Sequence, residues 1–195
     1  MNLKDIVASV NERMDSLETV RERSIAASRS VIRMTKKAIH AIHAGEEHEK
    51  ILNDTVSEYN FLYDSICKEP EILFSGTVAD AMMELSEVCI LSSIVLDKDV
   101  PSYVSLNVTP QSWAMGLADC LGELRRIMLT RLIDKDIKGA KKIFDRMEEV
   151  CDFILSFDVP EAILPIRRKQ DVARSVMERT RTDITNALLM CNVKY

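Results

Sequence analysis

Apolar residues recur along the chain with the period of an α-helix. Between residues 3 and 17 they are separated by steps of four, three, four and three, and the same rhythm resumes between residues 27 and 41. This spacing places them on one side of a helix. The pattern predicts one long amphipathic helix over residues 3–44, ended by Gly45, because glycine readily adopts the left-handed conformation that closes a helix.

Five further helices are predicted from the same periodicity. They cover residues 46–67, 71–96, 110–132, 137–157 and 166–191. Pro70 marks the end of the second helix, since the residue before a proline is steered out of the helical region. Thr109 and Pro110 form a helix start, with a capping threonine and a first-turn proline. We therefore expect an all-α bundle that forms a single domain over residues 1–195.

The composition supports this fold class. The 195 residues include only five glycines and five prolines, and 5% are aromatic. These fractions argue against β-sandwiches, barrels and glycine-rich nucleotide loops. With 47% hydrophobic and 29% charged residues, the chain is expected to fold and is neither a membrane protein nor a disordered one.

Charges and cysteines indicate the compartment. The first twenty residues carry six charged side chains, which excludes the apolar core of a signal peptide. The longest uncharged stretch, residues 100–118, contains two prolines and is not a bilayer span. The five cysteines are Cys67, Cys89, Cys120, Cys151 and Cys191. Their odd number and wide spacing favour buried free thiols in a reducing compartment, so a cytoplasmic location is expected.

One segment of the predicted first helix is strongly basic. The whole chain has a net charge of −5, but residues 21–43 hold six Lys or Arg against one Glu. The basic stripe consists of Arg29, Arg33, Lys36, His40 and His43, spaced by four, three, four and three, with Lys37 beside it. Such a stripe on one side of a helix can bind phosphates in a salt-sensitive way. The alternative is a solvated helix face, or one that meets an acidic neighbour.

Four acidic residues lie in apolar surroundings without a local cation. No Lys, Arg or His occurs between residues 68 and 98, yet Glu84 and Glu87 share a helix face there. Asp119 and Glu123 share a face of the following helix, where only Glu123 has a basic residue in helical reach. A carboxylate buried without a partner costs several kcal/mol or becomes neutral. These four residues therefore need an explanation.

The explanation that we weigh first is a metal site. If the two helices pack face to face, four carboxylates converge and suit Mg²⁺ or Mn²⁺. Two such ions can activate water and stabilise the leaving oxygen in phosphodiester cleavage. A di-iron centre is disfavoured, because its usual Glu-x-x-His signature needs a histidine and none follows His48. The alternative is that Glu84 and Glu87 are exposed, while Asp119 and Glu123 pair with nearby arginines, namely Arg125, Arg126 or Arg167.

Several segments resemble the translin superfamily. Residues 109–126, TPQSWAMGLADCLGELRR, resemble the signature helix of its catalytic branch, translin-associated factor X. Residues 82–88, MMELSEV, resemble the E-x-x-E helix of the family. Residues 30–43 are similar to its basic N-terminal helix, and residues 164–171, LPIRRKQD, to its C-terminal segment. The resemblance thus covers nearly the whole chain.

This resemblance implies a seven-helix all-α subunit that assembles into a closed, roughly octameric shell. It also implies a Mg²⁺- or Mn²⁺-dependent endoribonuclease acting on single-stranded or small structured RNA. The catalytic and metal-binding carboxylates of the family map onto Glu84, Glu87, Asp119 and Glu123. We expect the RNA to be bound by Arg29, Arg33, Lys36, Lys37 and His40, with Arg125 and Arg126 as secondary candidates.

Two other functions stay open at this stage. One is a translin-like shell that binds single-stranded nucleic acid without cleaving it, and the other is a protein that serves only in assembly. The chain also departs from the family pattern, since it lacks a long charged N-terminal extension and its loop before Thr109 is shorter. Whether a separate translin-type partner is used is therefore left open.

Overall fold

A computed structural model describes residues 2–192, with side chains described as far as residue 190. Within that range the chain forms seven α-helices and no strand. The helices are α1 (Leu3–Ala44), α2 (Glu49–Ile66), α3 (Pro70–Leu73), α4 (Gly76–Val95), α5 (Pro110–Ile133), α6 (Ile137–Ser156) and α7 (Arg167–Asn192). The predicted all-α class is confirmed.

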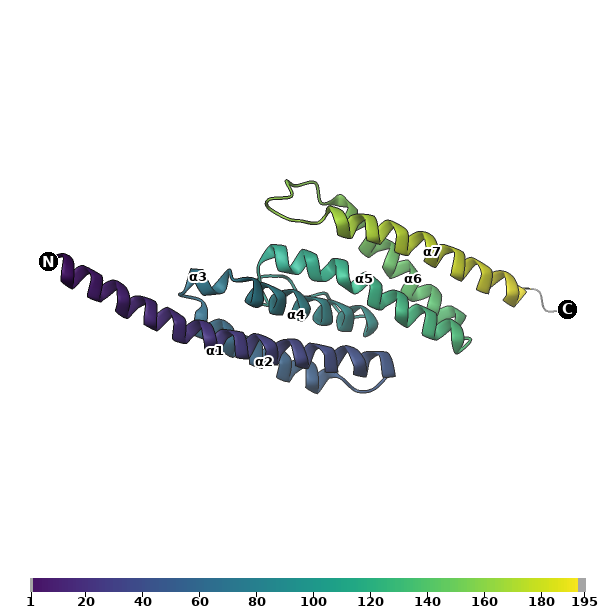
Figure 1. Ribbon diagram of the computed structural model, residues 1–195. Coiled ribbons are helices and arrows are strands. Elements are labelled where there is room, and N and C mark those ends of the chain that lie inside the picture. Colours follow the sequence, from purple (N-terminus) through teal and green to yellow (C-terminus); the bar gives the residue numbers. More distant parts are fainter. Residues whose placement is uncertain (1, 193–195) are drawn as a thin grey trace.

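The long helices lie in three layers (Figure 1). α4 and α5 pack together in the middle, α1 and α2 lie on one side of them, and α6 and α7 lie on the other. The core runs through all three layers, and the two central helices contribute many of its fully buried side chains. Examples are Leu85, Ile90, Leu91, Leu121 and Leu124, each at most 1% exposed.

The first helix has the predicted length. Asn2 accepts a hydrogen bond from the backbone of Asp5, whose side chain in turn accepts one from Asn2, and this capping box begins α1. Gly45 ends it with a left-handed φ of 68°. The apolar stripe is buried only in the second half of the helix, at residues such as Val31 and Ala38.

The first turns of α1 project beyond the rest of the chain (Figure 1). Their apolar stripe is open to solvent, with exposed fractions between 49% and 76% at Leu3, Val7, Val10 and Met14. Arg13 forms an ion pair with Glu69 just before α3, which ties the projecting part to the body of the molecule.

The prediction of a single helix over residues 71–96 is wrong. The chain leaves the helical path at Phe74 and Ser75, so α3 is a separate turn and α4 starts at Gly76. Ser75 has an extended backbone, with φ −69° and ψ 151°, and this bend lets Ile72 reach the core. Because both segments are apolar, periodicity alone did not reveal the break. The split brings the number of helices to the seven that the family resemblance implied.

Two further expectations concern membranes and thiols. Along residues 2–192 no helix combines the length and the apolar character needed to cross a membrane. Cys89, Cys120 and Cys151 are buried free thiols, as expected, and Cys67 is a partly buried one. The side chain of Cys191 lies outside the described residues.

A candidate carboxylate centre between α4 and α5

The two central helices approach each other closely at Gly116 of α5. A Cβ atom at this position would lie 2.6 Å from the carbonyl oxygen of Met83 and 2.8 Å from the backbone nitrogen of Glu87. Only a residue without a side chain permits such an approach. Asp119 and Glu123 follow Gly116 by three and seven residues, so they lie on the same face of α5 as this contact. The crossing therefore directs both carboxylates towards the segment of α4 that carries Glu84 and Glu87.

The carboxyl group of Glu87 is the most deeply buried of the four. Its residue is 9% exposed, and no hydrogen bond to its carboxylate occurs among the described residues. Its pKa is raised to about 8, first by burial and then by the neighbouring charges of Asp119, Glu84 and Glu123, while Lys169 acts in the opposite direction. The four acidic groups are therefore close enough to repel one another.

Glu84 lies beside Glu87 and faces α1. Burial raises its pKa, while Lys36 and a hydrogen bond from the Thr35 hydroxyl oppose that rise. Thr35 Oγ1 lies 3.4 Å from Glu84 Oε2. Lys36 belongs to the predicted basic stripe, so this stripe runs close to the carboxylates.

The two carboxylates of α5 are partly exposed and paired. Lys169 of α7 donates to Asp119 Oδ1, and His43 of α1 contacts Glu123 Oε2 through Nε2. The alternative prediction that Arg125 or Arg167 pairs with these two carboxylates is wrong, because both arginines contact other acids. Arg125 lies 2.8 Å from Asp183, and Arg167 lies 3.5 Å from Glu161.

Three residues contact the carboxylates although the sequence did not predict them as their partners. They are Thr35, His43 and Lys169. The sequence placed His43 at the end of the basic stripe, but its side chain is only 7% exposed. Thr35 and His43 are eight residues apart, about two helical turns, so they lie on one face of α1. The sequence shows this spacing, but it does not show which helix packs against that face of α1.

The remaining predicted RNA-binding residues are distributed as follows. Arg29, Arg33, Lys36, Lys37 and His40 are all exposed along α1. On α5, Arg126 is exposed, whereas Arg125 is partly buried and donates to Thr180 as well as to Asp183. Arg125 therefore already has partners within the chain.

The residues present fit a hard divalent cation by their chemistry. All four donors are carboxylates, the ligand type that Mg²⁺ and Mn²⁺ prefer, and a cation would relieve the repulsion that raises the pKa of Glu87. In the described part of the chain no three His, Cys, Asp or Glu side chains stand close enough together to hold a metal ion. Pairing with Lys169 and His43 occupies one oxygen of Asp119 and one of Glu123.

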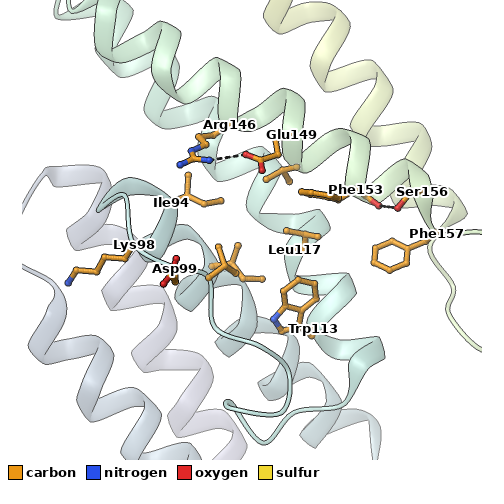
Figure 2. A pocket seen from close by; sticks show the side chains of 13 residues that line it. Ile94, Lys98, Asp99, Trp113, Leu117, Arg146, Glu149, Phe153, Ser156 and Phe157 are labelled. Atoms are coloured by element: carbon orange, nitrogen blue, oxygen red, sulfur yellow. Dashed lines mark hydrogen bonds and ion pairs between the residues drawn. The ribbon is translucent and has the colours of Figure 1, made fainter.

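A separate cavity of about 560 Å³ lies between α4, α5 and α6. Figure 2 shows Trp113 and Leu117 of α5 opposite the α6 side chain Phe153, with Lys98 directed away from the space. At its rim Arg146 pairs with Glu149 at 2.9 Å. None of the four carboxylates lines this cavity, so it is distinct from the carboxylate centre.

Known proteins resemble this chain over most of its length. No protein-family model matches it. An uncharacterized protein of Methanocaldococcus jannaschii, MJ0175, is 30% identical over 171 residues, which cover 86% of this chain and 76% of that protein. Two solved structures are similar as well. A complex of AfC3PO with duplex RNA has a TM-score of 0.89 at 30% identity, covering 96% of this chain and 99% of that one. The crystal structure of AfC3PO has a TM-score of 0.87 at 31% identity, covering 94% and 97%.

The chain belongs to the translin/C3PO family. The crystal structure of apo-NeC3PO shares the translin/C3PO fold, with a TM-score of 0.82, 18% identity and coverage of 93% of this chain and 96% of that one. The resemblance to the translin superfamily that the sequence motifs indicated is thereby confirmed, together with the all-α translin fold.

Proposed function

We propose that this protein is a metal-dependent endoribonuclease that binds and cleaves single-stranded or small structured RNA. The observation that carries the proposal is the close crossing at Gly116, beside which the charges of Asp119, Glu84 and Glu123 act on a buried Glu87 whose pKa is raised to about 8. The solved complex of AfC3PO with duplex RNA supports RNA as the ligand class.

In this proposal Glu84, Glu87, Asp119 and Glu123 hold Mg²⁺ or Mn²⁺ and form the catalytic site. When bound, such an ion supplies Lewis-acid chemistry for phosphodiester hydrolysis. The chain itself supplies the binding and orientation of the substrate. The exposed cations of α1, Arg29, Arg33, Lys36, Lys37 and His40, bind the RNA backbone, and Arg126 extends that surface onto α5. Arg125 is a weaker candidate, because it is already paired with Asp183.

We also propose that the protein acts as a homo-oligomer, with an octameric shell as the family arrangement. The support is the exposed apolar stripe on the projecting end of α1, since a contiguous apolar surface of this kind marks an interaction site. Size determination by light scattering tests the number of subunits.

A second function is a shell that binds RNA without cleaving it. It is favoured by the ion pairs that Asp119 and Glu123 form with Lys169 and His43, because paired carboxylates need no metal to be stable. The two functions differ in whether cleavage accompanies binding.

The decisive experiment is cleavage of a labelled single-stranded RNA in Mg²⁺, in Mn²⁺ and in EDTA. The purified protein is compared with Glu123→Ala of the same oligomeric size and with Glu178→Ala, which removes an exposed acid from α7. We expect metal-dependent cleavage by the wild type and Glu178→Ala and none by Glu123→Ala. Equal RNA binding by all three with no cleavage in any ion would leave the RNA-binding shell as the function.

A further inference from the structure

His43 differs from the other basic residues of its helix. The stripe residues before it are exposed, but the His43 side chain is 7% exposed and faces α5, and its Nε2 atom contacts Glu123. Its other ring nitrogen, Nδ1, is buried and has no hydrogen-bond partner. A histidine that served only to bind RNA or to cap the helix would keep its ring in water, so this placement needs another explanation.

The contact defines which ring nitrogen carries the hydrogen. An ionised carboxylate can only accept hydrogen bonds, so Nε2 must be the donor to Glu123. In the neutral ring Nδ1 is then a bare acceptor, which agrees with its lack of an accepting partner. One oxygen of Glu123 is held in this way, and the other is left for a further ligand.

The same face of α1 holds a carboxylate of the other central helix. Thr35 Oγ1 lies 3.4 Å from Glu84 Oε2 of α4, two turns before His43 reaches Glu123 of α5, and the same hydroxyl lies 2.9 Å from the carbonyl oxygen of Ile32. α1 therefore contacts one carboxylate from each of the two helices that form the centre. Because these contacts join residues 49 and 80 positions apart in the chain, they fix the carboxylates relative to α1.

We propose that His43 is a positioning residue of the carboxylate centre. Its Nε2–H group holds one oxygen of Glu123 and would restrict the orientation of this carboxylate when a divalent cation binds, and this inference rests on the proposed metal-dependent function. Outer-shell hydrogen bonds to ligating side chains typically change metal affinity by about 10–100-fold. The role needs a donor at the position of Nε2 and does not need the imidazole to touch the metal.

The test is a titration of Mn²⁺, with free Mn²⁺ measured by electron paramagnetic resonance, on the whole oligomer without RNA. We expect His43→Leu to bind Mn²⁺ about 10–100-fold more weakly than the wild type. His43→Gln is expected to restore most of the affinity, since its amide nitrogen can occupy the position of Nε2. Arg23→Leu removes an exposed basic side chain of the same helix that lies outside the basic stripe, and it is expected to leave Mn²⁺ affinity unchanged.

Two results would overturn the inference while leaving the metal site intact. The first is wild-type Mn²⁺ affinity in His43→Leu, and the second is affinity in His43→Gln as low as in His43→Leu. If His43→Leu does not fold, His43→Asn replaces it, because its shorter amide reaches only the position of Nδ1 and should lose affinity relative to His43→Gln. Failure of the wild type itself to bind Mn²⁺ would overturn the proposed function and the inference together.

Discussion

The carboxylates of α4 and those of α5 differ in burial and in ion pairing. On α4, Glu87 is buried among apolar residues without a hydrogen bond from the described residues, and burial together with the neighbouring acids raises its pKa to about 8. On α5, Asp119 and Glu123 are partly exposed, and each is paired with a basic side chain from another helix, Lys169 or His43. Negative charge is thus suppressed by burial on α4 and neutralised by partners on α5.

In the proposed metal site this difference would give the two helices separate roles. A cation bound at Glu87 would replace a proton and relieve the repulsion among the acids, so in the proposed site α4 would supply the electrostatic driving force. On α5 the proposed role of His43 is to position Glu123, whereas Lys169 supplies a positive charge to Asp119 that a bound cation could replace. Both roles require the helices to touch, which makes their crossing the most sensitive point.

Gly116→Val should have the largest effect, because it separates the two helices. The new side chain would meet Met83 and Glu87 backbone atoms within 2.8 Å. Overpacking of this kind costs about 1–3 kcal/mol of unfolding free energy, and a displacement of about 1 Å can lower a catalytic rate by about 100-fold. Urea unfolding and RNA cleavage measure the two quantities.

The matched control is Gly122→Ala on the same helix, where an added Cβ meets no atom within 4 Å. It should stabilise the protein by about 0.5–1 kcal/mol, because alanine favours a helix interior more than glycine does. Wild-type stability and cleavage in Gly116→Val would show that the close crossing does not assemble the centre.

Glu87→Gln tests the role of burial on α4. The folded chain binds the Glu87 proton more tightly than the unfolded chain, since the pKa rises from 4.5 to about 8. The stabilisation is therefore complete below pH 4.5, and the unfolding free energy of the metal-free protein falls as the pH rises towards about 8. Each proton contributes at most about 1.4 kcal/mol per pH unit. Glu84 contributes in the same direction.

We expect a smaller pH-dependent fall in Glu87→Gln than in the wild type when both are unfolded by urea in EDTA. Glu178→Gln, which changes an exposed acid, should keep the wild-type pH dependence. Parallel curves for Glu87→Gln and the wild type would contradict a buried, protonated Glu87.

Lys169→Met tests the role of pairing on α5, with a smaller expected effect. Removal of a partly exposed ion pair should lower the unfolding free energy of the metal-free protein by about 1 kcal/mol. Mn²⁺ should then raise the melting temperature of the variant more than that of the wild type, because the ion replaces the lost positive charge. Thermal unfolding with and without Mn²⁺ gives both values, and Arg168→Met, at an exposed neighbouring residue, is the control. An equal Mn²⁺ shift in all three proteins would contradict this prediction.

Substitution of two arginines should have the smallest effect, a change in the salt dependence of RNA binding. Arg33 is exposed on α1, whereas Arg125 of α5 is paired with Asp183 at 2.8 Å. Arg33→Ala should reduce the slope of log affinity against log salt by about one. Arg125→Ala should change it less, since a paired guanidinium contacts phosphate less readily. Binding titrations at several salt concentrations decide this, and equal slopes for the two variants would place Arg125 in the RNA surface.

The helices were predictable because their signals are local. Asn2 and Thr109 cap the first turns of α1 and α5, and the left-handed Gly45 ends the last turn of α1. Each of these signals acts within one helical turn. The break at Phe74 and Ser75 was missed because apolar residues lie on both sides of it. The segment before the break carries Ile72, which is buried, and α3 contacts α1 as well as its sequence neighbours α2 and α4.

The sequence by itself determined which acids share a helix face, since three- and four-residue spacing is set by the geometry of a single helix. It also determined that α4 could offer Glu84 and Glu87 no cation of its own. Only the tertiary structure decided that Lys169 and His43 are the partners of Asp119 and Glu123, from 50 and 80 residues away. Electrostatic interaction depends on distance in space, and helix packing sets that distance independently of separation along the chain.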